Sequence, residues 1–299
     1  MINESPLILD RIKQCQDHMV EALTRFLPPQ NSPFAKSMHY ACLNGGKRLR
    51  PLLVFSTAEI FEMAWEELDP LACAIEFIHC YSLIHDDLPC MDNDDLRRGL
   101  PTCHKAFGEA AAVLAGDGLL TLAFEVLSSQ PFPTISESTV LKMIQILSRA
   151  SGTPHGMVQG QAIDIESQGK RLSFEELTQL HLLKTGALIT ASVQCAALAT
   201  GRASEGDLDK LQKFGQSIGL AFQIQDDILD HLGNRENMGK EPGKDVKNQK
   251  STFVTLLGIA RAREHALAAH QKALGYLDHF KHNAHSLRSL SQFIIDRVS

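Results

Sequence analysis

The sequence lacks the features that mark several classes of protein. Its seven cysteines include no C-x-x-C pair, which is the pattern expected of reduced, mostly buried thiols in a cytosolic protein. Polar or charged residues interrupt every apolar run before the roughly 18 residues of a membrane-spanning helix. The first residues, MINESPLILDRIKQ, lack the basic stretch followed by an apolar stretch of a signal peptide. We therefore expect a cytoplasmic protein with no membrane span.

A surplus of positive charge is also missing. The 299 residues include 29 Lys and Arg against 35 Asp and Glu, a formal net charge of -6. Because nucleic-acid binding usually shows as a basic domain or stripe, no nucleic-acid partner is expected, and an anionic ligand must be held by local basic clusters. No composition break, repeat or low-complexity segment divides the chain, so we predict a single domain over residues 1–299.

Long windows rich in Ala, Leu, Ile and Gln fill much of the chain instead. The windows are 71–87, 116–129, 185–201 and 211–233. They are longer than ordinary strands and do not alternate between apolar and polar residues, which favours helices. Proline and glycine interrupt the pattern at 27–33, around 89, at 131–133 and at 233–243. Helices that are apolar on most faces must be enclosed by other helices, so the sequence predicts an all-α fold, a large helical bundle.

The stretch HDDLPCMDNDDLRRG, residues 85–99, concentrates five aspartates before two arginines. Asp86 and Asp92 are six residues apart, which on a regular helix would place them about 240° out of phase. Pro89 ends or kinks the helix because it lacks an N–H and clashes with the preceding turn, so Asp92 can fold back toward Asp86. A solvated acidic loop is the plain alternative, but carboxylates at a helix C-terminus oppose the helix dipole. The pattern therefore favours a bound cation.

A second acidic segment, QIQDDILDHLG, follows another apolar helix. Asp226 and Asp230 share a helix face, and Asp227 lies about 100° round it. D-D-x-x-D alone is a weak pattern that also suits a solvated helix end. However, Mg²⁺ is usually held by one or two carboxylates together with substrate phosphates, so two facing aspartate clusters predict Mg²⁺ ions that bridge to one diphosphate. Calcium is less favoured, because no twelve-residue loop has the EF-hand spacing.

Three basic segments accompany the two acidic ones. They are NGGKRLRP (44–51), the arginine pair 97–98, and MGKEPGKDVKNQKST (238–252). The two glycines of the first allow close backbone approach to a phosphate, although the P-loop pattern is not satisfied, and the arginine pair offers planar forks for phosphate oxygens. For Arg48, Lys244 and Lys247 we favour a simpler role in solubility. Together the segments predict a polyanionic ligand that is held partly through metal.

Together these motifs resemble those of the trans-isoprenyl diphosphate synthases, most closely the bacterial farnesyl diphosphate synthases. The resemblance rests on GGKRLRP, HCYSLIHDDLPCMDNDDLRRGLPTCH, LAGDGLLTLAFEVL, GMVQGQAIDI, KTGALI, GLAFQIQDDILD and GKDVKNQKST, in the family order. It implies antiparallel helices around a deep central active-site cavity, and a homodimer. It also implies a Mg²⁺-dependent head-to-tail condensation of isopentenyl diphosphate with dimethylallyl and geranyl diphosphate. The implied product is farnesyl diphosphate, formed through an allylic carbocation.

Matched position by position, the resemblance implies a role for individual residues. Those implied to bind Mg²⁺ and to act in catalysis are Asp86, Asp92 and Asp226, with Asp87, Asp227 and Asp230 beside them. Those implied to hold the allylic diphosphate are Arg97, Lys184 and Lys240. Those implied to hold isopentenyl diphosphate are Lys47, Arg50, His79 and Arg98. Those implied to stabilise the carbocation are Thr185 and Gln223.

Product length is implied to depend on Tyr81, five residues before Asp86 and about 7.5 Å away along a helix. An aromatic side chain there would form the floor of the cavity and limit the product to fifteen carbons. From local context alone, His79 is favoured as a core histidine, and the resemblance reverses that interpretation. Tyr81 also suits an ordinary core position, and Lys184 suits a helix end. Whether the terminal FIIDRVS segment closes over the site stays open.

Three positions depart from the family pattern: Gln159 and Gln249 stand where glycine is common, and Val254 where proline is frequent. None removes a charged ligand, so we expect only adjusted loop conformations. The alternatives are a longer-chain, geranylgeranyl diphosphate synthase, a terpene cyclase, and a non-catalytic subunit of a heteromeric synthase. A cyclase has no isopentenyl diphosphate to hold with GGKRLRP and Arg98, and a non-catalytic subunit would be expected to lose aspartates that are intact here.

Overall fold

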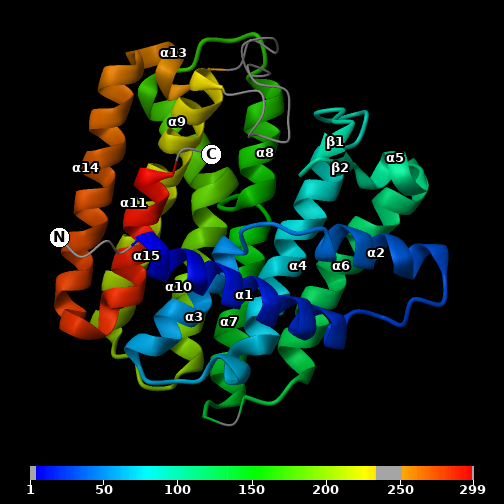
Figure 1. Ribbon diagram of the computed structural model, residues 1–299, viewed down its shortest axis with the longest axis horizontal. Helices are drawn as coiled ribbons and strands as arrows, with labels where there is room; N and C mark the ends of the chain where they lie inside the picture. The colour runs from blue at the N-terminus through cyan, green and yellow to red at the C-terminus, as the bar shows by residue number, and fades with distance from the viewer. Residues whose placement is uncertain (1–4, 133, 234–250, 298–299) are drawn as a thin grey trace.

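The computed structural model describes residues 5–132, 134–233 and 251–297, which are almost entirely helical (Figure 1). The α-helices are α1 (Ser5–Phe26), α2 (Pro33–Leu43), α3 (Leu49–Ile60), α4 (Asp69–Asp86), α5 (Cys103–Phe107), α6 (Glu109–Ser129), α7 (Glu137–Ser151), α8 (Met157–Glu166), α9 (Phe174–His181), α10 (Ala187–Ala199), α11 (Glu205–Leu232), α13 (Phe253–Leu257), α14 (Ile259–Leu277) and α15 (His285–Asp296). The short elements are the 3-10 helices η1 (Trp65–Leu68) and η3 (Asp278–Ala284), the π-helical turn η2 (Leu182–Gly186), and the antiparallel strands β1 (Leu96–Arg97) and β2 (Leu100–Pro101). The predicted all-α class is confirmed.

Helix boundaries fall where the sequence places its caps and prolines. Ser32 accepts a hydrogen bond from the backbone N–H of Ala35, and Pro33 occupies the first turn of α2, a position where a missing N–H costs nothing. Ser204 and Asp207 form a capping box at the start of α11. The predicted break at 27–33 is therefore the end of one helix and the capped start of the next.

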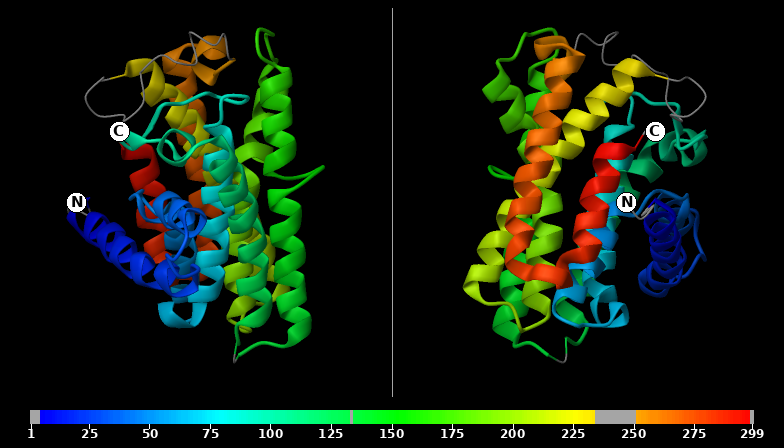
Figure 2. Two further views of the ribbon diagram at one scale, coloured as in Figure 1. Left: turned by 90° about the vertical axis from the view of Figure 1, so that its right-hand side faces the viewer. Right: turned by 60° about the vertical axis from the view of Figure 1, so that its left-hand side comes forward.

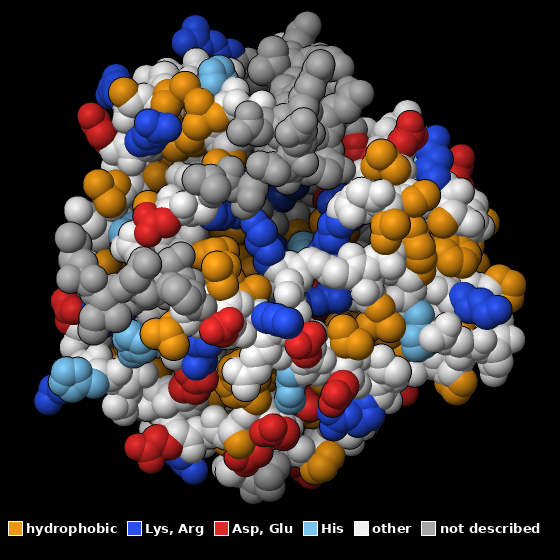
Figure 3. Space-filling model, in the orientation of Figure 1, with side chains coloured by type: hydrophobic (Ala, Val, Ile, Leu, Met, Phe, Trp, Pro, Cys, Tyr) orange, Lys and Arg blue, Asp and Glu red, His pale blue; other side chains and the backbone are white. Residues whose placement is uncertain are grey.

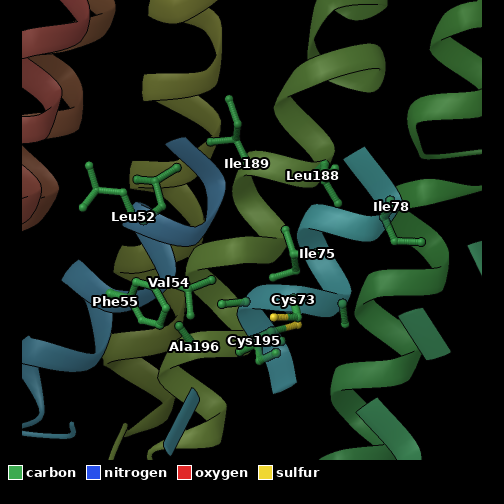
Figure 4. Close-up of a cluster of buried hydrophobic side chains, with 14 of the residues drawn as sticks. Leu52, Val54, Phe55, Cys73, Ile75, Ile78, Leu188, Ile189, Cys195 and Ala196 are labelled. Atoms are coloured by element: carbon green, nitrogen blue, oxygen red, sulfur yellow. The ribbon is translucent and has the colours of Figure 1, made fainter. Parts of the chain in front are cut away.

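The long helices run side by side, and α1 and α2 lie across one side of them (Figures 1 and 2). Helix α10 lies inside the bundle, in contact with α3, α4, α7 and α11. Figure 4 shows buried side chains from α3, α4 and α10 meeting in this core, among them Val54, Ile75 and Leu188. Enclosure by other helices explains why the 185–201 window is apolar on nearly every face. Six of the seven cysteines are buried, as expected, and Cys90 is exposed.

Two glycines bring α11 unusually close to the start of α10. A Cβ on Gly215 would lie 2.8 Å from the Cα of Thr190, and one on Gly219 would lie 2.9 Å from the Cα of Gly186. Any larger residue would push the helices apart. The close approach sets the end of α11, with its aspartates, beside the turn that carries Lys184.

Two helical stretches, Glu109–Ser129 and Phe174–Ala199, are long and apolar enough to cross a membrane by length and composition alone. Polar and charged residues interrupt both segments, and the absence of a membrane span stays a prediction. Phe174–Ala199 is mostly buried among other helices, and a core helix passes the same test. Glu109–Ser129, which is α6, is 39% buried over its most apolar window. It leaves the apolar side chains of Val113 and Leu114 exposed.

Candidate active site

Two adjoining cavities lie between the helices. The first, of about 740 Å³, is lined by cationic side chains that include Lys47, Arg98 and Arg297; we call it the basic chamber. The second, of about 640 Å³, has apolar walls and acidic residues that include Asp86 and Asp92; we call it the acidic chamber. The residues that line both are Arg50, His79, Arg97, Phe222 and Asp226. Figure 3 shows this face of the molecule hollowed at its centre, with Lys and Arg side chains around the hollow.

The chain after α4 turns back on itself at Pro89, as the sequence predicts. Helix α4 ends at Asp86, and the backbone N–H of Asp92 donates a hydrogen bond of 2.9 Å to the carbonyl oxygen of Asp86. Asn93 then adopts the left-handed conformation, with φ at 49°, which asparagine tolerates better than most residues. Asp86 and Asp92 consequently line the same wall of the acidic chamber.

Asp87 points into the protein instead of into the acidic chamber. Its buried carboxylate accepts a hydrogen bond of 2.6 Å from Nε of Arg97 and a second from Nη2, a bidentate pair. Such a pair fixes both the position and the plane of a guanidinium. Because Arg97 lines both chambers, Asp87 is a positioning residue for the predicted phosphate ligand Arg97.

Lys184 is held in the same manner by a residue that sequence reasoning missed. Its Nζ lies 2.7 Å from Oδ2 of Asp164 on α8. Gly160 permits the close approach of α8 to η2, the turn that carries Lys184, since a Cβ on Gly160 would lie 2.3 Å from the backbone nitrogen of Lys184. The only signal for Asp164 was a single carboxylate in the apolar run GMVQGQAIDI. Lys184, Thr185 and Gln223 all line the acidic chamber.

The second acidic segment places one aspartate at the chambers and turns its neighbour away. Asp226 lines both chambers, whereas the buried Asp227 accepts a 2.7 Å hydrogen bond from the backbone N–H of Phe253 at the start of α13. Asp230 lines neither chamber. Asp227 thus joins two helices, and Asp226 is the member of the trio placed to face a ligand.

The GGKRLRP segment supplies two ligand candidates and one structural arginine. Lys47 and Arg50 line the basic chamber. Arg48 is buried, and its Nη1 lies 2.6 Å from Oε1 of Glu76. The solubility role favoured for Arg48 was wrong, because a fully desolvated arginine requires a charged partner.

The two glycines of this segment accommodate an arginine in the structure. A Cβ on Gly46 would lie 2.5 Å from Cζ of Arg98, and Nη1 of Arg98 donates a hydrogen bond to the carbonyl oxygen of Gly45. Both glycines have positive φ, 73° and 111°, values that other residues rarely adopt. The loop that contains Gly45 and Gly46 therefore holds the guanidinium of Arg98 at the wall of the basic chamber.

The charges in the chambers are crowded and partly desolvated. Burial lowers the pKa of Arg50 and of Lys47, and the charge of Arg297 lowers the pKa of Lys47 further. Burial, followed by the charge of Arg50, lowers the pKa of His79 well below its ordinary value, so the neutral imidazole is favoured at pH 7. A concentration of positive charge with so few compensating acids is a site for a polyanion.

Two carboxylates of the acidic chamber, Asp86 and Asp226, are partly desolvated as well. Burial raises the pKa of Asp86 and of Asp226, and the positive charges of Lys184 and Arg297 respectively act against that rise. Among the described residues no three His, Cys, Asp or Glu side chains converge as a closed metal site. One pair of carboxylates and one single carboxylate suit Mg²⁺, which completes its coordination with water and phosphate oxygens. The predicted ligand Lys240 lies outside the described residues.

Comparisons with known proteins find relatives of this chain that match it along nearly its whole length. Residues 31–289 match the family model named polyprenyl synthetase. The farnesyl diphosphate synthase of Escherichia coli (strain K12) is 46% identical to this chain, covering 96% of it and 98% of the relative. The crystal structure of a geranyltransferase from Legionella pneumophila superposes with a TM-score of 0.87 at 37% identity, covering 99% of each chain. The apo structure of an FPP/GFPP synthase from Zymomonas mobilis does so with a TM-score of 0.85 at 40% identity, covering 96% of this chain and 98% of that one. This chain therefore belongs to the polyprenyl synthetase family.

Proposed function

We propose that this protein is a Mg²⁺-dependent prenyltransferase that condenses isopentenyl diphosphate with dimethylallyl and then geranyl diphosphate, giving farnesyl diphosphate. The observation that carries the proposal is the pair of chambers that meet at Arg50, His79, Arg97, Phe222 and Asp226. Two diphosphates can be held on opposite sides of this junction. Their hydrocarbon parts can then meet between them.

The basic chamber suits isopentenyl diphosphate, whose phosphate oxygens would be held by Lys47, Arg50, His79 and Arg98. The acidic chamber suits the allylic substrate. Its diphosphate would be held by Arg97, Lys184 and Lys240, and its hydrocarbon tail would lie against apolar side chains such as Tyr81 and Met157. Asp86, Asp92 and Asp226 would hold Mg²⁺, which when bound neutralises the negative charge that develops on a leaving diphosphate.

The chain's own side chains then promote ionisation of the allylic substrate. Lys184 and Arg97 are fixed by Asp164 and Asp87, so they need no reorganisation as the carbon–oxygen bond breaks and its electrons leave with diphosphate. Thr185 and Gln223 line the acidic chamber, where their oxygen dipoles can stabilise the allylic carbocation. The isopentenyl double bond attacks that cation, and a proton is lost to diphosphate.

We further propose a cytoplasmic homodimer of single-domain subunits. Helix α6 supports the dimer, because its apolar face is only partly covered within one chain: Val113 is 40% and Leu114 is 56% exposed. Packing α6 against a second copy would remove these apolar side chains from water.

The direct test is to incubate the purified protein with isopentenyl diphosphate, geranyl diphosphate and Mg²⁺, and to measure product chain length with and without a chelator. We expect a fifteen-carbon diphosphate that the chelator abolishes. Asp226→Asn should lower the rate by about 10²–10³-fold, the usual loss when a group that stabilises developing charge is removed. Asp209→Asn, which removes an exposed ion pair with Lys213 on the same helix, is the matched control.

A longer product would keep the chemistry and remove Tyr81 from its role as the floor of the chamber. Absence of condensation in folded protein, with both dimethylallyl and geranyl diphosphate, would favour a non-catalytic subunit instead.

A further inference from the structure

The side chain of Arg297, just beyond the end of α15, is turned onto α11. Its Nη2 lies 2.5 Å from Oδ1 of Asp226 and donates a 2.9 Å hydrogen bond to the carbonyl oxygen of Phe222. The guanidinium lies 4.0 Å from the centroid of the Phe222 ring, and Nε2 of Gln225 donates to the carbonyl oxygen of Arg297. Only 6% of the Arg297 side chain is exposed. These contacts hold a permanently charged guanidinium against Asp226, the aspartate that lines both chambers.

The position of this guanidinium opposes the binding of a metal ion by Asp226. The guanidinium already engages Oδ1 of Asp226, and a Mg²⁺ ion on the same carboxylate would lie beside a second positive charge that repels it. Arginine cannot relieve the conflict by losing its proton. The guanidinium and a Mg²⁺ ion therefore compete for the negative charge of Asp226.

The hydrogen bonding of Arg297 in this position is also incomplete, which lowers the free-energy cost of moving its side chain away from Asp226. Nε of Arg297 is buried without a hydrogen-bond partner among the described residues, which is unfavourable for a buried donor. Lys47 lies close enough for the charge of Arg297 to depress its pKa. Arg297 therefore sits beside another cation and with one donor unsatisfied.

Building on the proposed function, we propose that Arg297 is an exchangeable counter-ion for Asp226. It holds the carboxylate while the enzyme is free of metal, and it leaves when Mg²⁺ binds together with a diphosphate. In the metal-free state Arg297 holds the carboxylate of Asp226 in a fixed orientation. Once released, its guanidinium remains at the wall of the basic chamber, which it already lines, and adds positive charge where the second diphosphate binds.

The test is the affinity of the full-length protein for Mg²⁺ in the presence of saturating inorganic diphosphate, measured by titration calorimetry without turnover. Arg297→Gln removes the competing charge and should tighten Mg²⁺ binding by about tenfold, the factor that corresponds to breaking one charged hydrogen bond. Arg297→Lys keeps a competing charge and should restore weaker binding. Arg288→Gln breaks an ion pair with Asp278 on the surface near α15 and should bind as the wild type does.

A positive result is the rise in affinity for Arg297→Gln and its reversal in Arg297→Lys. Equal or weaker Mg²⁺ binding by Arg297→Gln would overturn the proposal, because Arg297 would then be a structural anchor or a direct diphosphate ligand. If that variant does not fold, Gln225→Ala, which removes the hydrogen bond to the Arg297 backbone, provides the test: tighter binding supports the exchange, and unchanged binding contradicts it.

The same titration separates this proposal from the proposed function. A wild-type protein that binds no Mg²⁺ with diphosphate would contradict both. A wild-type protein that binds Mg²⁺ and condenses its substrates, while the variants bind Mg²⁺ as the wild type does, would contradict the Arg297 proposal alone.

Discussion

At the scale of single residues, neighbouring aspartates have different partners. Asp86 faces the acidic chamber while Asp87 orients Arg97, and Asp226 faces both chambers while Asp227 ties α11 to α13. Successive helical residues are separated by about 100°, so a cavity on one side of a helix receives only one of each pair. In each aspartate-rich motif, therefore, one aspartate faces the ligand site, and its neighbour holds the surrounding structure in place.

Tyr81 provides a test at this scale. It is nearly buried, lines the acidic chamber, and packs edge-on against His85. Tyr81→Ala should open space at the end of the chamber, so that the product shifts from fifteen carbons to twenty or more while condensation continues. Chromatography of the dephosphorylated products measures this shift. Unchanged product length in the variant would show that another side chain forms the floor.

At the scale of elements, the crossing of α8 over η2 determines where Lys184 lies. Gly160→Ala would place a methyl group 2.3 Å from the backbone nitrogen of Lys184, so the two elements must separate. We expect a loss of about 1–3 kcal/mol in the free energy of unfolding, as in other overpacked cores. The catalytic rate should also fall, because Lys184 moves away from the diphosphate.

Gly275 in α14 is the matched control, because a Cβ there meets nothing within 4 Å. Gly275→Ala should raise the unfolding free energy by about 0.5–1 kcal/mol, the usual gain in a helix interior, and leave the rate unchanged. Denaturant unfolding and steady-state kinetics measure both effects. Equal stability changes in the two variants would contradict the close crossing.

At the scale of the whole molecule, the exposed apolar side chains of α6 form the surface that the proposed dimer would cover. Leu114→Glu would place a charge on that face and should convert a dimer to a monomer, because burying an unpaired charge opposes association. Leu267→Glu, at a 47% exposed leucine on α14, is the control and should leave the dimer intact. Sedimentation velocity gives the mass in each case. A monomeric wild type, or a dimeric Leu114→Glu, would contradict the assignment of this face.

The sequence by itself determined the all-α class, the approximate positions of the four helices α4, α6, α10 and α11, the turn at Pro89 that returns Asp92 to Asp86, and the family. These features depend on local rules, namely the helical period, end-capping and the geometry of proline, and on motif order. Only the tertiary structure decided the pairs Asp87–Arg97, Asp164–Lys184, Arg48–Glu76 and Asp226–Arg297, and the seating of Arg98 on Gly46. The physical reason is that a charged side chain takes as its partner whichever group the packing of distant helices brings within reach.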